Sequence, residues 1–229
     1  MPYTPYQTST LTKTFFHKVF GLMAGALAIT AATALGIAMN PFLFKYIFSN
    51  SLVTILLIIG QLAAVVSLSA FIMRMSTPMA LLIYALYSVS VGVTTSAVLF
   101  VYTPDSVYTT FLVCALMFGV MALYGYFSDA DLSSMGSLAR MGVIGLIIAL
   151  MVNLYFKNET LDLILSFLGV GIFLILTAYD MQRIKGLGVA AGYDSHNENR
   201  FALMGALTLY LDFINLFFML LRIMGRRRD

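Results

Sequence analysis

The stretch FALMGALTLYLDFINLFFMLL, residues 201–221, decides how this chain is interpreted. Its only charged residue is Asp212, which lies between the uncharged runs Phe201–Leu211 and Phe213–Leu221. A carboxylate at the centre of a membrane-spanning helix costs roughly 2.5–3.5 kcal/mol on insertion scales, so it normally faces a protein interior, a partner or a water-filled path. Asp212 is therefore the first candidate functional residue, and Asp180 in LILTAYDMQRIK is the second.

The composition of the whole chain indicates a membrane protein. Of the 229 residues, 61% are hydrophobic and 10% are charged, whereas a soluble domain carries about 25% charged residues. The mean hydropathy is +0.94. Uncharged runs, several of them longer than the ~20 residues that span a bilayer core, predict seven transmembrane helices. These helices cover residues 17–39, 52–73, 79–102, 107–127, 140–156, 162–184 and 202–223.

We therefore predict an all-α integral membrane protein, a seven-transmembrane-helix bundle that forms a single domain over residues 1–229. A polar N-terminal arm covers residues 1–16, the longest loop covers residues 185–200, and a basic tail covers residues 224–229. Because the last helix has a central carboxylate in apolar surroundings, we expect it to be the most buried helix.

The charges of the loops predict the orientation, since cytoplasmic loops carry an excess of lysine and arginine. Seven such residues fall on the N-terminal side of the predicted spans and two on the other side, if the tail is left out. This favours a cytoplasmic N-terminus, although the cluster Arg226–Arg228 argues the other way. No basic stripe with interleaved aromatic residues occurs, so we expect no nucleic-acid partner.

Motifs of the common enzyme and metal classes are missing. The chain has two histidines, His17 and His196, and no HExxH, GxSxG or glycine-rich phosphate loop, so we expect no cofactor. Asp129 and Asp131 lie in a polar loop that lacks the glycine and terminal glutamate of an EF-hand. We interpret them as helix-capping residues of a solvated turn.

Several polar residues near the two aspartates are candidates for supporting roles. Arg74 ends the second predicted helix, either as a positive-inside anchor or as a partner of Asp180 on the same side of the membrane. Arg183, one turn after Asp180, is an alternative partner for that carboxylate. Asn215 is a candidate hydrogen-bond partner of Asp212.

Small residues recur every three to four positions in the first predicted helix, at Gly21, Gly25, Ala28, Ala32 and Gly36. Such rows let helices approach closely. We interpret the row as packing within the bundle. A dimer face at Gly21 and Gly25 is the alternative, so the oligomeric state stays open.

Three segments of the chain form a recognisable set. They are MFGVMALYGYFSDADLSSMG (Met117–Gly136), LTAYDMQRIK (Leu176–Lys185) and GALTLYLDFINLFFMLLRIMG (Gly205–Gly225). The first resembles the fourth span and following loop of the Bax inhibitor family, also called TMBIM, and in particular of its bacterial branch. The second resembles the family's sixth span, and the third resembles its last span. The resemblance extends, in order, over essentially the whole chain.

The resemblance implies a bundle with the C-terminal helix central, in the inner membrane of a bacterium. It also implies a pH-sensitive calcium leak, and in animals suppression of cell death. Asp180 and Asp212 match the buried hydrogen-bonded aspartate pair of the family. Arg74 matches an arginine that can pair with the first aspartate and hold the path closed. Further candidates for support of this gate are Tyr179, Arg183 and Asn215.

We therefore predict a pH-sensitive calcium (cation) leak channel, not an enzyme, whose partners are the lipid bilayer, calcium ions and protons. Two carboxylates in contact cannot both ionise cheaply in a low dielectric, so they share one proton and titrate as a unit. A further proton weakens the attraction between Arg74 and Asp180 and opens the path. Asp180 and Asp212 would then form the path of the calcium ion.

Two other functions stay open. One is a membrane interaction protein that restrains a membrane protease or another membrane partner through the arm MPYTPYQTSTLTKT. The other is an intramembrane aspartyl protease, which Tyr179-Asp180 followed by Asp212 superficially resembles. Against the protease, the expected Gly-x-Gly before the second aspartate is replaced by Leu209-Tyr210-Leu211.

Overall fold

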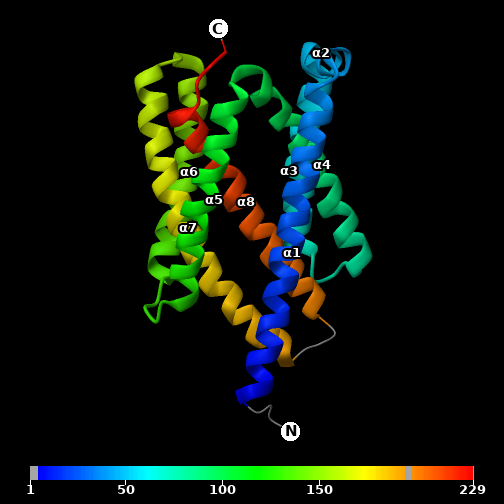
Figure 1. Ribbon diagram of the computed structural model, residues 1–229, viewed down its shortest axis with the longest axis vertical. Coiled ribbons are helices and arrows are strands. Elements are labelled where there is room, and N and C mark those ends of the chain that lie inside the picture. The colour runs from blue at the N-terminus through cyan, green and yellow to red at the C-terminus, as the bar shows by residue number, and fades with distance from the viewer. Residues whose placement is uncertain (1–4, 194–196, 229) are drawn as a thin grey trace. The chain divides into compact units, whose positions relative to one another are not determined.

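The computed structural model describes residues 5–193 and 197–228, and this part of the chain forms eight α-helices (Figure 1). They are α1 (Pro5–Ala38), α2 (Pro41–Ser49), α3 (Ser51–Phe71), α4 (Thr77–Val101), α5 (Pro104–Phe127), α6 (Ser133–Phe156), α7 (Glu159–Tyr193) and α8 (Glu198–Met224). Within the described residues, seven of them, all except α2, are long and apolar enough to cross a membrane. The predicted all-α architecture with seven spans is confirmed.

Helix α2 is the element that the sequence-based prediction lacks. Its start is set by Asn40, whose side chain accepts a hydrogen bond from the Leu43 N–H at 3.1 Å, and by Pro41 in the first turn. Proline at this position loses no intrahelical bond. Asn50 ends α2 and caps α3, accepting a hydrogen bond from the Leu52 N–H at 3.1 Å. These capping signals are local, and a helix of 9 residues is too short to be detected as a span.

The predicted loop at 185–200 is wrong in extent, because α7 continues to Tyr193 and α8 begins at Glu198. No proline interrupts this stretch, and a glycine inside a helix costs only about 1 kcal/mol relative to alanine. A Cβ atom at Gly188 would lie 2.9 Å from the Phe15 ring, so this glycine lets α7 approach α1. The predicted arm at 1–16 is likewise helical from Pro5 onward. Residues 1–4 of the arm and His196 lie outside the described residues.

The helices group into two compact units. Unit 1 contains α1 to α4 together with Leu187–Leu207, and unit 2 contains Tyr102–Gly186 and Thr208–Arg227. Helices α7 and α8 therefore contribute one end to each unit. The prediction of a single domain over the whole chain stays a prediction.

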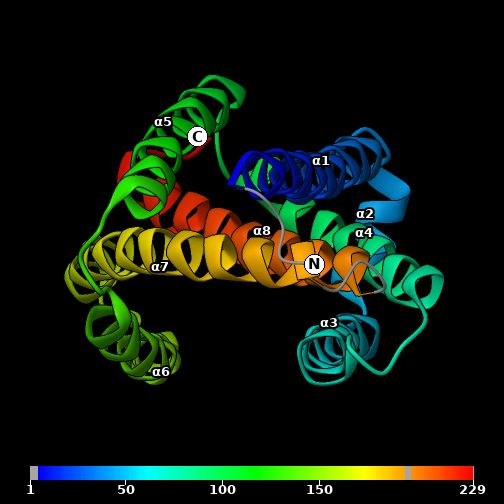
Figure 2. The ribbon, with the colours of Figure 1, turned by 90° about the horizontal axis from the view of Figure 1, so that it is seen from below.

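In unit 1, α1 runs alongside α4 (Figure 2). The Thr30 hydroxyl donates a hydrogen bond to the Ser88 carbonyl oxygen at 3.0 Å. A Cβ atom at Gly92 would lie 2.6 Å from the Thr30 carbonyl oxygen, so it is this glycine of α4 that lets the helices approach. The predicted close packing at Gly21 and Gly25 is wrong, because a Cβ atom at either position would meet nothing within 4 Å.

In unit 2, α5 and α6 pack against α7 through two glycines. A Cβ atom at Gly125 of α5 would overlap the Ala178 carbonyl, and one at Gly136 of α6 would overlap the Tyr179 ring. The overlap at Gly125 is with backbone atoms and can be relieved only by moving a helix, whereas the overlap at Gly136 requires the Tyr179 side chain to move. Both contacts fall directly before Asp180, so the two glycines determine where α7 holds that carboxylate.

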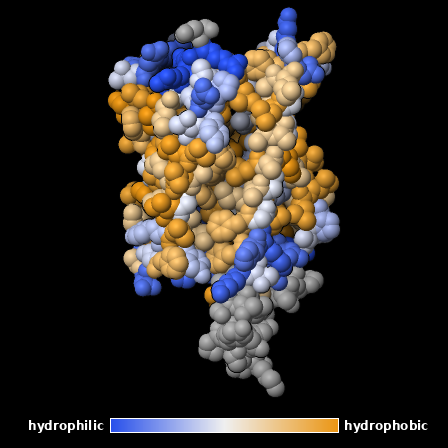
Figure 3. Space-filling model, viewed as in Figure 1, coloured by the Kyte–Doolittle hydropathy of each residue, from blue (hydrophilic) through white to orange (hydrophobic). Residues whose placement is uncertain are grey.

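Helix α8 is the most buried of the seven candidate spans in the described residues. Of its most apolar window 67% is buried, against 44% for α7 and 6% for α3. The prediction that the last helix is the most buried is confirmed. On the face drawn in Figure 3, apolar residues cover the middle of the helices and polar residues gather at helix ends. This distribution is expected where the sides of helices face lipid tails.

Candidate functional site

Asp180 of α7 and Asp212 of α8 both belong to unit 2, and they are 7% and 5% exposed. Each of the two carboxyl groups acts electrostatically on the other. Within the described residues, the Oδ2 atom of Asp212 is buried and has no hydrogen-bond partner. Buried polar atoms are normally satisfied, and a carboxylate oxygen can be satisfied only by a donor. A proton on either carboxyl group would provide one.

The two carboxylates lie at similar distances along their helices from the connection between α7 and α8. Asp180 lies 13 residues before the end of α7 at Tyr193, and Asp212 lies 14 residues after the start of α8 at Glu198. At a rise of 1.5 Å per residue, both lie about 20 Å along their helices from the connection. The shorter span predicted at 162–184 leaves Asp180 near the membrane surface and Asp212 near the centre. The longer α7 removes this mismatch.

Apolar groups of α5 cover α8 directly after Asp212. The ring of Phe213 makes edge contacts with Phe111 and Phe118, with ring centroids 5.6 and 5.4 Å apart. The Cys114 thiol lies 3.6 Å from the Phe213 carbonyl oxygen. These contacts make the surroundings of α8 next to Asp212 apolar, and a low local dielectric strengthens any electrostatic interaction that a buried carboxyl group makes.

Two guanidinium groups act on Asp180 within unit 2, those of Arg183 and Arg140. Arg183 is exposed and follows Asp180 by one turn of α7. Arg140 of α6 donates a hydrogen bond to the Tyr179 hydroxyl at 3.2 Å, and its guanidinium carbon lies 4.8 Å from the Tyr179 ring centroid. Tyr179 and Arg183 thus lie next to Asp180 on α7, and their supporting role at a gate stays a prediction. Arg140 is a further basic residue near Asp180.

Gln182 is a further residue of this site that the sequence did not single out. Its side-chain oxygen accepts a hydrogen bond from the Leu132 N–H at 3.1 Å, and its side-chain nitrogen donates to the Ala130 carbonyl oxygen at 2.8 Å. Gln182 thereby attaches the α5–α6 connection to α7, two residues after Asp180. Its position inside the segment YDMQRIK is the only sequence signal of this role.

The remaining predicted site residues are not brought to the pair by any contact that the structure shows. Asn215 donates its side-chain hydrogen bond to the Leu211 carbonyl oxygen at 2.8 Å, on its own helix. It therefore supports α8, not Asp212. Arg74 is exposed in the turn after α3, in unit 1, and its N–H donates to the Phe71 carbonyl oxygen at 2.8 Å. Its pairing with Asp180 stays a prediction.

One of the two acids between α5 and α6, Asp131, makes a hydrogen bond at the start of α6. The capping role predicted for Asp129 stays a prediction. Asp131 Oδ1 accepts a hydrogen bond from the Ser133 N–H at 2.9 Å, at the first residue of α6. Hydrogen bonds from Ser133 lower the pKa of Asp131 below its usual value. Across residues 5–193 and 197–228, no group of three or more His, Cys, Asp or Glu side chains is arranged to hold a metal ion.

Comparison with known proteins assigns the family. The family model described as "Inhibitor of apoptosis-promoting Bax1" matches residues 12–229. The chain belongs to the Bax inhibitor family. The inner membrane protein YbhL of Escherichia coli K12 is 43% identical to it over 217 residues, which cover 94% of this chain and 93% of YbhL. Uncharacterized proteins of Borreliella burgdorferi and Rickettsia prowazekii are 41% and 38% identical, over 94% of this chain and 93% and 90% of their own lengths.

Membership of the Bax inhibitor family agrees with the seven apolar spans. Together with the inner-membrane relative from E. coli, it supports an integral protein of the inner membrane. The family is one of membrane proteins and is not a known enzyme family. The cytoplasmic location of the N-terminus stays a prediction.

Proposed function

We propose that this Bax inhibitor family member is a pH-gated cation leak channel, with calcium among the ions that it passes and Asp180 and Asp212 as its gate. The observation that carries the proposal is the buried carboxyl pair on neighbouring spans. One oxygen of the pair, Oδ2 of Asp212, has no donor within the described residues.

The pair responds to pH because its two acids are of like charge and buried. Two carboxylates in contact repel each other strongly in a low dielectric, so the pair holds a proton that both oxygens share. Losing or gaining one proton changes the net charge of the site by one unit in surroundings that screen charge poorly. A charge change of this size can bias a two-state element between closed and open arrangements.

Calcium passing this gate would meet oxygen ligands of the type that it prefers. Ca²⁺ takes six to eight oxygen ligands, commonly from carboxylates, carbonyls and water. The two carboxyl groups of Asp180 and Asp212 offer four oxygens at most, so water must supply the rest. This combination favours an ion in transit over a tightly bound one.

Positive groups near the pair would oppose opening. Arg140 and Arg183 act on Asp180 within unit 2, and Arg74 is proposed to act as a latch that pairs with the same carboxylate. When Asp180 is ionised these cations attract it, and when it is protonated the attraction is lost. Acidification would therefore loosen the contact and increase the leak.

Replacing Asp212 with asparagine tests the proposal. Asparagine has nearly the shape of aspartic acid, and its amide can donate a hydrogen bond to Asp180, so it imitates a carboxyl group that is always protonated. Calcium flux into liposomes containing purified Asp212→Asn should lose its dependence on pH between 5 and 8. Asp105→Asn is the matched control, because Asp105 is exposed in the first turn of α5. An unchanged pH response of Asp212→Asn would rule out the carboxyl pair as the sensor.

The other functions are retained only as predictions. The interaction protein that restrains a membrane protease depends on the N-terminal arm, of which residues 1–4 lie outside the described residues. No structural contact in the described part favours that role over the leak. The absence of enzymatic activity and of a cofactor also stays an expectation.

A further inference from the structure

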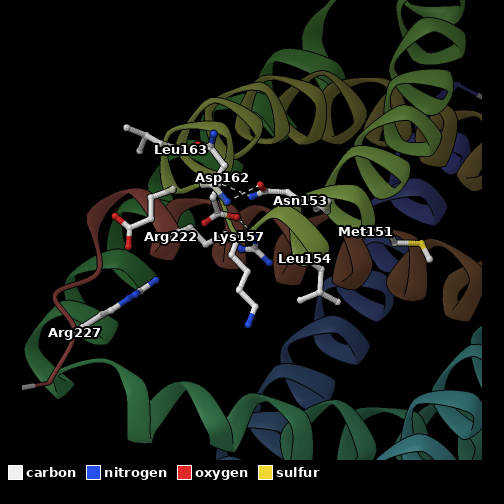
Figure 4. Close-up of a pocket in the computed structure, with 11 residues that line it drawn as sticks. Met151, Asn153, Leu154, Lys157, Asp162, Leu163, Arg222 and Arg227 are labelled. Atoms are coloured by element: carbon white, nitrogen blue, oxygen red, sulfur yellow. Dashed lines mark hydrogen bonds and ion pairs between the residues drawn. The ribbon is translucent and has the colours of Figure 1, made fainter.

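A polar pocket lies in unit 2, where the end of α6, the start of α7 and the end of α8 meet (Figure 4). It has a volume of about 760 Å³, which is within the usual range for small-molecule sites. Three cations, Lys157, Arg222 and Arg227, line it together with the acids Glu159 and Asp162. The carboxyl pair described above is not part of it.

The turn between α6 and α7, which lines this pocket with Lys157 and Asn158, is fixed by hydrogen bonds. Asn153, which is buried at the end of α6, donates to the Asn158 carbonyl oxygen and accepts from the Asn158 N–H, both at 3.1 Å. The Asn158 side chain in turn accepts from the Leu161 N–H at 3.0 Å in the first turn of α7. The pocket is therefore built on a rigid connection, and Lys157 extends from that connection.

Lys157 occupies an unusual backbone conformation. It ends α6 with a φ of 51°, in the left-handed region, and its N–H donates to the Asn153 carbonyl oxygen at 2.7 Å. Glycine is the usual residue at such a helix end, because a side chain there is strained. A lysine at this position therefore costs stability that glycine would not. The cost makes its ammonium group a candidate for a binding role.

The charges of the pocket are not balanced internally. Arg222 Nη1 and Asp162 Oδ1 form an ion pair at 2.7 Å, and Figure 4 shows the Lys157 side chain extending away from this pair. In the part of the chain that the structure describes, neither Lys157 nor Arg227 forms an ion pair. The exposed Glu159 offsets one of these two charges, so the pocket carries a net positive charge.

One wall of the pocket is apolar and faces outward. Met151 and Leu154 of α6 and Leu163 of α7 line it, and all three side chains are exposed. They belong to helices that are apolar enough to cross a membrane. A ligand in this pocket would thus meet cations at the helix ends and an apolar surface along the helix sides.

We propose that this pocket binds an anionic phospholipid. The headgroup phosphate lies at Lys157 and Arg227, and an acyl chain lies along Met151, Leu154 and Leu163. Basic pockets between membrane helices are suited to acidic lipid headgroups. A free phosphate ion would use the cations but not the apolar wall, so the amphipathic lining favours the lipid as the occupant.

The experiment measures phospholipid binding to the full-length purified protein by native mass spectrometry, with phosphatidylglycerol and phosphatidylcholine compared. Lys157→Gly and Arg227→Ala should each weaken phosphatidylglycerol binding about five-fold, since a basic residue near an acidic lipid contributes about 1 kcal/mol. Phosphatidylcholine, which has no net charge, should bind more weakly to the wild type. Lys157→Gly should fold at least as well as the wild type without lipid, because glycine relieves the left-handed strain.

The control is Lys45→Ala, which removes the same charge from the exposed face of α2. A general loss of positive surface charge should affect Lys45→Ala and the two pocket variants equally. Equal binding by Lys157→Gly, Arg227→Ala and Lys45→Ala would overturn the proposal. Thermal protection of the wild type by inorganic phosphate as large as that by phosphatidylglycerol would overturn the lipid as the occupant.

Discussion

Helices α7 and α8 meet through a polar pair at two places in unit 2, and the two pairs differ in charge and in exposure. Asp180 and Asp212 are two acids, both buried. Asp162 and Arg222 are an acid and a base 2.7 Å apart, with side chains 35% and 39% exposed. The same two helices thus carry a pair of like charges in an apolar setting and a pair of opposite charges near water.

The difference shows that burial, not the presence of an aspartate, decides what such a pair can do. In an exposed ion pair the two charges neutralise each other, and the pair contributes between 0 and about 1 kcal/mol to stability because water and salt screen it. Two buried acids repel each other when both are ionised, so they need a proton. The outer pair can therefore act only as a weak anchor, whereas the inner pair can respond to pH.

The largest expected effect comes from breaking the packing that holds the buried pair. A Cβ atom at Gly125 would overlap the Ala178 carbonyl of α7, so Gly125→Ala must push α7 away from α5 two residues before Asp180. Overpacking of this kind typically destabilises by about 1–3 kcal/mol. Thermal unfolding of the purified variant in detergent measures the loss.

The matched control for this substitution lies on the same helix. A Cβ atom at Gly119 would meet nothing within 4 Å, so Gly119→Ala should gain up to about 1 kcal/mol, since alanine is the better helix former. Equal unfolding temperatures for Gly125→Ala and Gly119→Ala would show that α5 does not determine the position of Asp180.

A smaller effect is expected from the cation that is proposed to close the gate. Arg74 is exposed, so its pairing with Asp180 should be worth no more than about 1 kcal/mol, or about five-fold in the ratio of open to closed molecules. Arg74→Ala should raise the leak at neutral pH by up to that factor. Arg74→Lys should restore closure only in part, because the planar fork of the guanidinium is lost.

Flux normalised to inserted protein, measured from pH 5 to 8, separates a latch from a topological anchor. If Arg74 serves only in orientation, Arg74→Ala changes the amount inserted while flux per molecule follows the wild-type curve. Arg140→Ala gives the internal comparison, because Arg140 acts on Asp180 within unit 2. A larger rise in the leak at neutral pH for Arg140→Ala than for Arg74→Ala would identify Arg140 of α6, not Arg74, as the residue that holds the gate closed.

The sequence predicted the spans well because one physical constraint sets them. A bilayer core requires about 20 apolar residues per helix, and that requirement is visible in the composition alone. The ends of the helices follow no such rule. Past residue 184, α7 continues into a segment where Gly188 approaches Phe15 of α1, a tertiary contact that a sequence pattern does not show.

The same distinction applies to the site. Asp212 and Asp180 stand out in the sequence because a charge inside a span is costly. Gln182 does not stand out, since a neutral side chain in a membrane helix carries no penalty comparable to that of a charge. Its role depends on the backbone groups of Ala130 and Leu132, which only the folded chain brings to it. The contact of Arg140 with the Tyr179 hydroxyl likewise depends on the packing of α6 against α7 and leaves no signal in the sequence.

The smallest expected effect comes from breaking the exposed pair. Asp162→Asn keeps the shape of the side chain and removes its charge, so it should lower the unfolding free energy by no more than about 1 kcal/mol. A double-mutant cycle with Arg222→Gln, measured by unfolding in lipid-free detergent, isolates the interaction from the other contacts of each residue.

The coupling free energy between Asp162 and Arg222 should fall toward zero in 1 M salt, where the Debye length is about 3 Å. A coupling of about 3 kcal/mol that persists in high salt would mean that the outer pair is effectively buried. The contrast between the two contacts of α7 and α8 would then lie in the sign of their charges alone.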